Sequence, residues 1–160
     1  MQIRVMNREY ISYYKSPIGL IEIVGTSDSI TELNFADKRR QDSTSHPNVR
    51  KAKQQVAEYF EGTRRQFDLR LEMSGTDFQR QVWQRLQTVP YGRTASYQDI
   101  ARGIGRPAAV RAVGAANGRN PVAIIVPCHR IIGKNGHLVG YGSGIWRKEW
   151  LLKHEGYLLI

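Results

Sequence analysis

The chain has 160 residues, 41% of them hydrophobic, and a formal net charge of +10. This length suits one core, or one core with a small appended domain, and the hydrophobic content excludes a chain that is disordered throughout. No apolar stretch approaches the roughly 18–20 residues that span a bilayer, and residues 1–9 contain no apolar core of signal-peptide length, so we expect a soluble, cytoplasmic protein without a membrane partner.

The first half of the chain is predicted to form a small α/β unit. Segments 10–15, 20–25 and 30–35 are rich in β-prone residues and are separated by turn residues, which is typical of an antiparallel meander. Residues 38–48 are polar and are predicted to be a loop. Apolar residues at helical spacing predict a helix over 49–60, and the alternation in 67–71 predicts one more strand.

The second half is predicted to be mainly helical. Helices are expected over 78–86, with Thr76 or Asp77 as the cap, and over 97–102, with Ser96 as the cap. A small-residue helix follows over 108–117, and the short turn between these last two helices is typical of a helix-turn-helix. A final helix is expected over 146–154. The fold class is therefore α/β (α+β), with an N-terminal domain over 1–74 and a C-terminal domain over 75–160.

Charge is distributed unevenly between these two domains. Residues 1–74 carry twelve Lys and Arg against ten Asp and Glu, whereas residues 75–160 carry twelve against four. A basic excess in one half indicates a polyanionic partner, most simply nucleic acid. The alternative is a basic surface that serves only solubility.

Cys128, the only cysteine, lies in the motif Pro127-Cys128-His129-Arg130 after an aliphatic run. A single cysteine excludes an internal disulfide and the multi-cysteine zinc sites. Neighbouring positive charge or a nearby base favours the thiolate, so Cys128 is a candidate nucleophile, although a lone cysteine can also be a small buried hydrophobe. A carboxylate should orient His129. Spacing alone does not choose among the acids of this half, which are Asp77, Asp99, Glu149 and Glu155.

Arg111 lies on the helix of small residues and is a candidate for DNA contact. Ala112 and Ala115 would let that helix approach a groove closely, although small residues serve tight helix packing equally well.

Four segments resemble the O6-alkylguanine-DNA alkyltransferases, also called methylated-DNA–protein-cysteine methyltransferases. They are residues 90–97, residues 111–117, Asn120-Pro121 and residues 125–130, and the tail over 148–156 fits as well. The resemblance covers the last half of the chain strongly and the first half only through the turn at 16–19. It implies direct repair of O6-alkylguanine, and of O4-alkylthymine, by irreversible transfer of the alkyl group to Cys128.

The same resemblance implies roles for individual residues. His129 acts as a base through a water, Glu155 orients it, Asn120 braces the active-site turn, and Tyr97 donates a proton to the leaving guanine. Arg111 fills the gap left by the flipped nucleotide. The implied DNA-binding residues are Arg111, Tyr97, Ala112, Ala115 and Arg119, and the implied pocket residues are Tyr141, Ile131, Gly142 and Pro121.

The resemblance further implies double-stranded DNA containing O6-alkylguanine as the partner, no cofactor, no metal, and a monomer in the absence of DNA. Two other hypotheses remain open on the residues. One is a non-enzymatic protein that binds and flags alkylated DNA, although such proteins replace the acceptor cysteine. The other is a cysteine hydrolase.

Overall fold

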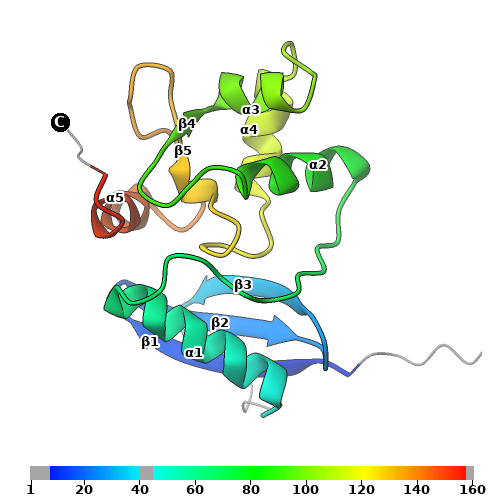
Figure 1. Ribbon diagram of the computed structural model, residues 1–160, viewed down its shortest axis with the longest axis vertical. Coiled ribbons are helices and arrows are strands. Elements are labelled where there is room, and N and C mark those ends of the chain that lie inside the picture. The colour runs from blue at the N-terminus through cyan, green and yellow to red at the C-terminus, as the bar shows by residue number, and fades with distance from the viewer. Residues whose placement is uncertain (1–7, 40–44, 158–160) are drawn as a thin grey trace, which may run out of the picture. The chain divides into compact units, whose positions relative to one another are not determined.

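The computed structural model describes residues 8–39 and 45–157, so the expected loop over 38–48 and residues 1–9 fall partly outside the described residues. The chain divides into two compact units, Met1–Glu72 and Met73–Ile160, and the division lies two residues before the predicted one (Figure 1). None of the helices within the described ranges is long and apolar enough to cross a bilayer.

The N-terminal unit is a three-stranded antiparallel sheet with one helix. The strands β1 (Tyr10–Ser16), β2 (Gly19–Gly25) and β3 (Ile30–Ala36) pair in sequence order, as the meander predicts. The helix α1 (Pro47–Glu61) runs across one face of this sheet (Figure 1) and ends at Gly62, which adopts a left-handed conformation. The predicted apolar face of α1 is buried, and it consists of Val49, Ala52, Val56, Tyr59 and Phe60.

The fourth strand predicted over 67–71 is wrong. Only an isolated bridge joins Leu71 to Ile30. The side chain of Gln55 on α1 forms hydrogen bonds with both backbone groups of Asp68. It accepts from the Asp68 N–H at 2.9 Å and donates to the Asp68 carbonyl at 3.1 Å. Because a side chain satisfies the backbone of Asp68, pairing with the sheet is confined to the end of the segment, where Arg70 and Glu72 bond to the two backbone groups of Ile30.

The C-terminal unit contains the predicted helices. Both α2 (Asp77–Leu86) and α3 (Tyr97–Gly103) begin with capping boxes, through Thr76 and Ser96 respectively, so Thr76 is the cap of α2. The helix α4 (Val110–Gly118) begins two residues later than predicted. It packs against α2 and α3. The indole of Trp83 on α2 donates to the carbonyl of Ala116 on α4 at 2.8 Å, which fixes this helix pair.

The C-terminal unit also contains a short parallel strand pair that the sequence pattern does not reveal. β4 (Ala95–Ser96) pairs with β5 (Ile131–Ile132), and β5 directly follows the 3₁₀ helix η1 (Cys128–Arg130). This pairing connects the start of α3 to the segment that carries Cys128. The last helix, α5 (Ile145–His154), packs against η1. Two-residue strands are too short for a periodic signal.

Candidate active site

Cys128 is held at the start of η1 by a tightly folded loop. Its side chain is buried, and its backbone N–H donates to the carbonyl of Val126 at 2.8 Å. Earlier in this loop the N–H of Ile125 donates to the carbonyl of Ala123 at 2.8 Å, closing a γ-turn around Ile124. Ile124 has φ of 71° and is the one non-glycine residue with positive φ within the described ranges. A β-branched residue rarely adopts this conformation, so the loop stores backbone strain.

Asn120 braces that loop through both ends of its side-chain amide. The Asn120 Nδ2 group donates to the carbonyl of Val126 at 2.7 Å, and Oδ1 accepts from the N–H of Val122 at 3.0 Å. These two bonds span the strained turn. Burial raises the pKa of the Cys128 thiol, and a hydrogen bond from Asn120 opposes that rise. Asn120 therefore contacts both the turn and the sulfur.

His129 and Glu155 form a buried pair. His129 Nε2 lies 2.8 Å from Glu155 Oε2, and both side chains are fully buried. Arg130 also binds Glu155, through Nε to Oε1 at 2.8 Å and through Nη2 to Oε2 at 3.0 Å. Burial alone would raise the pKa of Glu155, but the hydrogen bonds and charges of His129 and Arg130 hold it well below its usual range. Among the four acids left open by spacing, Glu155 is the one paired with His129.

This pairing determines which nitrogen of His129 is free. An ionised carboxylate only accepts hydrogen bonds, so His129 Nε2 carries the proton that is donated to Glu155. Burial lowers the pKa of His129, outweighing the opposing influence of Glu155, so the ring is neutral near pH 7. His129 Nδ1 is buried and has no hydrogen-bond partner. A buried, unprotonated nitrogen of this kind is suited to accept a proton.

Two tyrosines and a lysine from other segments interact electrostatically with the thiol. The hydroxyl of Tyr97, on α3, donates to the carbonyl of Val139 at 2.9 Å, and burial followed by the influence of Cys128 raises its pKa. The hydroxyl of Tyr141 is buried without a hydrogen-bond partner, and burial raises its pKa well above the usual value. Lys148 on α5 is fully buried, and its charge lowers the pKa of Cys128.

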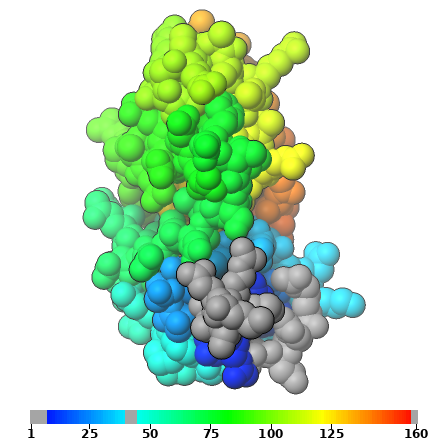
Figure 2. Space-filling view, turned by 90° about the vertical axis from the view of Figure 1, so that its right-hand side faces the viewer, coloured from blue at the N-terminus to red at the C-terminus, as the bar shows by residue number. Residues whose placement is uncertain are grey.

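The remaining sequence-predicted residues lie on α4 or in loops. Arg111, Ala112, Ala115 and Arg119 are all exposed, on or directly after α4, and the residues around them form the yellow-green surface at the top of Figure 2. The ring of Tyr97 lies 3.8 Å from the point where a Cβ on Gly114 would stand, so α3 and α4 approach closely. Pro121 is half-buried, Ile131 is buried in β5, and Gly142 is exposed.

Three residues near Cys128 were missed by the sequence analysis, namely Arg130 as a partner of Glu155, Lys148 and Asn117. A signal existed for Lys148, because Lys148, Leu151 and Leu152 are buried at helical spacing and place a basic residue on the apolar face of α5. Asn117 Nδ2 donates to the carbonyl of Cys128 at 3.4 Å, while its Oδ1 has no hydrogen-bond partner.

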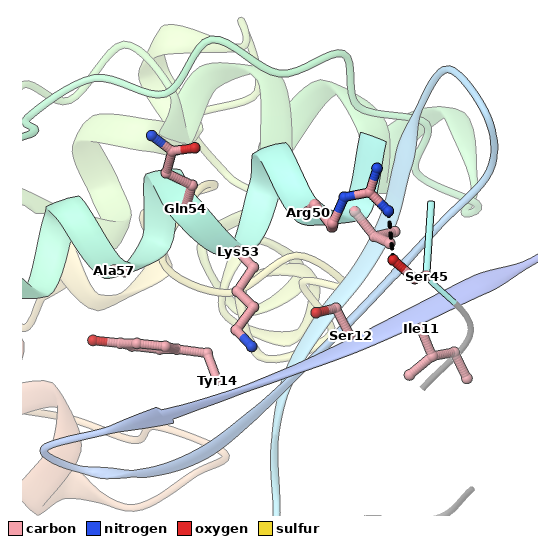
Figure 3. Close-up of a pocket in the computed structure, with 9 residues that line it drawn as sticks. Ile11, Ser12, Tyr14, Ser45, Arg50, Lys53, Gln54 and Ala57 are labelled. Atoms are coloured by element: carbon pink, nitrogen blue, oxygen red, sulfur yellow. Dashed lines mark hydrogen bonds between the residues drawn. The ribbon is translucent and has the colours of Figure 1, made fainter. Parts of the chain in front are cut away.

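A separate hollow of about 460 Å³ lies in the N-terminal unit between β1 and α1. Figure 3 shows Lys53 and Tyr14 beside it and the hydrogen bond from Arg50 to Ser45 at its edge. Its lining contains no cysteine, histidine or carboxylate. Within the described ranges, no group of three His, Cys, Asp or Glu side chains is placed to hold a metal ion.

The site therefore combines a buried cysteine with a neutral histidine and an ionised glutamate, which is the arrangement expected of a protein that uses a cysteine nucleophile. Comparison with protein families identifies which one. Residues 77–157 match the 6-O-methylguanine DNA methyltransferase, DNA binding domain, and residues 10–73 match the ribonuclease-like domain of the same proteins. The chain belongs to the 6-O-methylguanine DNA methyltransferase family.

Individual relatives and solved structures agree with this membership. The methylated-DNA–protein-cysteine methyltransferase of Mycolicibacterium paratuberculosis is 48% identical over 145 residues, which is 88% of each chain. That of Methanosarcina acetivorans is 46% identical over 153 residues, covering 92% of this chain and 98% of the relative.

The crystal structure of Mycobacterium tuberculosis O6-methylguanine methyltransferase matches with a TM-score of 0.84 and 44% identity, over 92% of this chain and 93% of that one. The Mycobacterium tuberculosis protein in complex with DNA matches with a TM-score of 0.83 and 47% identity, over 89% and 90% of the two chains. The predicted fold class is confirmed.

Proposed function

We propose that this protein repairs DNA by moving an alkyl group from O6 of guanine to the sulfur of Cys128. Family membership supports the reaction, and the buried pair of His129 and Glu155 beside the only cysteine is the observation that carries it at the level of atoms. Relatives that share almost half of their residues with this chain are named for the same transfer. The activity is that of a methylated-DNA–protein-cysteine methyltransferase.

The transfer is a single displacement at the alkyl carbon. His129 Nδ1 takes the thiol proton of Cys128 through a bridging water, and Glu155 stabilises the imidazolium that forms. The sulfur then attacks the alkyl carbon, a carbon–sulfur bond forms, and the carbon–O6 bond breaks with its electron pair left on the guanine. A proton from Tyr97 neutralises that guanine, and the tyrosinate recovers a proton from His129. The thioether on Cys128 has no leaving route, so each molecule reacts once.

Tyr97 is equipped for the role of donor. Its raised pKa keeps the hydroxyl protonated at neutral pH. In this structure the hydroxyl donates to the carbonyl of Val139, and it exchanges this acceptor for the guanine when substrate binds. Tyr141 and Gly142 lie in the same loop, and with Pro121 and Ile131 they form the walls that receive the flipped base. The same pocket would admit O4-alkylthymine.

Binding to double-stranded DNA follows from the exposed face of α4. Ala112 and Ala115 let the helix approach a minor groove, while Arg111 replaces the base that leaves the stack. The excess of twelve basic over four acidic residues in positions 75–160 supplies affinity for phosphates that does not depend on sequence. We assign residues 75–160 to DNA binding and transfer, and residues 1–74 to support. The protein acts in the cytoplasm, where a free thiol persists, and is a monomer in the absence of DNA.

Intact-mass measurement after incubation with duplex DNA containing O6-methylguanine tests the proposal. The wild-type protein should gain the mass of one methylene group, and Cys128→Ser should gain nothing while still binding the DNA. Tight binding of the lesion by the wild-type protein without a mass gain would instead identify a protein that only flags alkylated DNA. Turnover of a thioester or peptide substrate would identify a hydrolase.

A further inference from the structure

Lys148 is the buried ionisable group that the proposed reaction leaves unused. It lies on α5 with an exposed fraction of 0%, which makes it one of the largest fully buried side chains in the described part of the protein. No carboxylate among the described residues forms an ion pair with it. Its ammonium donates instead to the carbonyls of Val139 at 3.1 Å and Gly140 at 3.2 Å. Burying an ammonium is costly unless hydrogen bonds and an opposite charge compensate.

Cys128 is the ionisable group whose negative charge, when the thiolate forms, favours this ammonium. Burial lowers the pKa of Lys148 to about 8, and the thiolate of Cys128 acts in the opposite direction and favours the ammonium. The influence is mutual, because the charge of Lys148 lowers the pKa of the Cys128 thiol. Other ionisable groups around this sulfur are Tyr97, Tyr141 and His129. Lys148 is the one cation among the charges that act directly on the pKa of Cys128.

The two carbonyls that bind Lys148 belong to the loop that forms the pocket wall. Val139 and Gly140 directly precede Tyr141, and the carbonyl of Val139 also accepts from the hydroxyl of Tyr97. When the Tyr97 hydroxyl turns toward a guanine, the hydrogen bond from Lys148 still holds the carbonyl of Val139 in place. The same side chain therefore binds the loop and acts electrostatically on the thiol.

Building on the transfer proposed above, we infer that Lys148 is a positioning residue for the reaction, whose buried ammonium anchors the Val139–Gly140 loop and, from there, favours the thiolate of Cys128. It does not exchange protons with substrate. The proton of the thiol goes to His129, and at pH 7, which is below its pKa of about 8, Lys148 keeps its charge.

Three substitutions separate the two roles. Lys148→Arg keeps the charge, Lys148→Gln keeps an N–H donor for the carbonyls without the charge, and Lys148→Met removes both. The matched control is Lys153→Met on the same helix, because Lys153 is exposed and, among the described residues, forms its ion pair with Glu149 at the surface. Cys128 is the only cysteine, so labelling with iodoacetamide followed by intact-mass measurement reports this thiol alone.

The measurement is the labelling rate between pH 5.5 and 9.5, together with amide hydrogen exchange over residues 138–144. Lys148→Gln and Lys148→Met should shift the thiol titration upward by about one pH unit, which lowers labelling about tenfold at pH 7. Below pH 8, where Lys148 of the wild type is still charged, Lys148→Arg and Lys153→Met should be labelled at the wild-type rate. Exchange in the loop should be faster in Lys148→Met than in Lys148→Gln.

A titration of Lys148→Gln that coincides with that of the wild type would overturn the electrostatic role, and unchanged exchange in Lys148→Met would overturn the anchoring role. If Lys148→Met does not fold, Lys148→Gln decides the electrostatic role and its exchange is compared with that of Lys148→Arg. Neither readout uses alkylated DNA. Failure of this inference is therefore distinguishable from failure of the transfer itself, which the mass gain of the wild-type protein tests.

Discussion

His129 and Arg130, which are adjacent in sequence, both bind the carboxylate of Glu155, and they share its Oε2 atom at 2.8 and 3.0 Å. Arg130 also donates through Nη1 to the carbonyl of Val89 at 2.8 Å, so it connects η1 both to the segment after α2 and to the end of α5. Glu155 thus has two functions. It orients the imidazole, and it neutralises a buried guanidinium that holds the unit together.

Glu155→Gln should therefore destabilise the protein as well as slow alkyl transfer. Removing one partner of a buried ion pair leaves the charge of Arg130 uncompensated, which costs about 3–5 kcal/mol of unfolding free energy. Urea unfolding measures this loss. The control is Glu149→Gln, whose exposed pair with Lys153 should contribute less than about 1 kcal/mol. Equal stability of the two variants would contradict the structural role of Glu155.

Stability should fall as the pH decreases below 7, in two stages. The pKa of His129 is lowered in the folded protein, so the unfolded chain binds more protons and unfolding becomes easier as the pH falls through the ordinary histidine range near 6.5. The pKa of Glu155 is also lowered, so its contribution is full above the ordinary value of 4.5 and is lost progressively below it. Unfolding free energies measured at intervals from pH 7.5 to pH 3 should show both stages.

His129→Asn tests the assignment of the first stage. This variant has no imidazole to titrate, so its unfolding free energy should vary less between pH 7.5 and 5.5 than that of the wild type. The stage below pH 4.5 should persist, because Arg130 still binds Glu155. An unchanged slope in the upper range would assign that stage to another group.

The sequence was sufficient to predict the main elements because each has a local signal. The meander follows from β-prone runs and turns, and the helices follow from apolar spacing and caps such as Thr76 and Ser96. The prediction of a strand over 67–71 was wrong because Gln55, from another element, forms hydrogen bonds with the backbone groups of Asp68. No local pattern predicts a side chain that satisfies a distant backbone.

The active site shows the same division between local and distant information. Cys128 and His129 are adjacent, so the motif alone indicates a nucleophile and a base, whereas spacing could not choose Glu155, which lies 26 residues away from His129. Only the resemblance to a family did so. Lys148 was missed because a lysine on a helix is ordinarily exposed, and its burial depends on carbonyls supplied by the preceding loop.

Arg111→Ala should impair repair of duplex DNA without impairing the chemistry at Cys128. Arg111 is exposed on α4, so its removal leaves the thiol and its partners intact. Without a side chain to fill the stack, nucleotide flipping loses a stabilisation of a few kcal/mol, and transfer from duplex DNA should slow by about tenfold or more. Free O6-benzylguanine needs no flipping and should react at the wild-type rate.

The matched control for that experiment is Arg64→Ala in the N-terminal unit, where Arg64 pairs with Glu58. It removes one positive charge without touching α4, so it should leave both substrates nearly unaffected at the same salt concentration. Equal losses on duplex DNA and on O6-benzylguanine in Arg111→Ala would remove the proposed role of Arg111 in flipping.

The strained turn at Ile124 should reverse the usual order of alanine and glycine. Glycine ordinarily destabilises a structured position by roughly 0.5–1 kcal/mol relative to alanine. At φ of 71° alanine is strained and glycine is not, so Ile124→Gly should be more stable than Ile124→Ala by about 1 kcal/mol, although both lose the buried side chain. Val122, in the same loop and without positive φ, provides the control pair, in which alanine should be the more stable. Urea unfolding of the four variants measures both orders, and an ordinary order at Ile124 would show that the turn stores no strain.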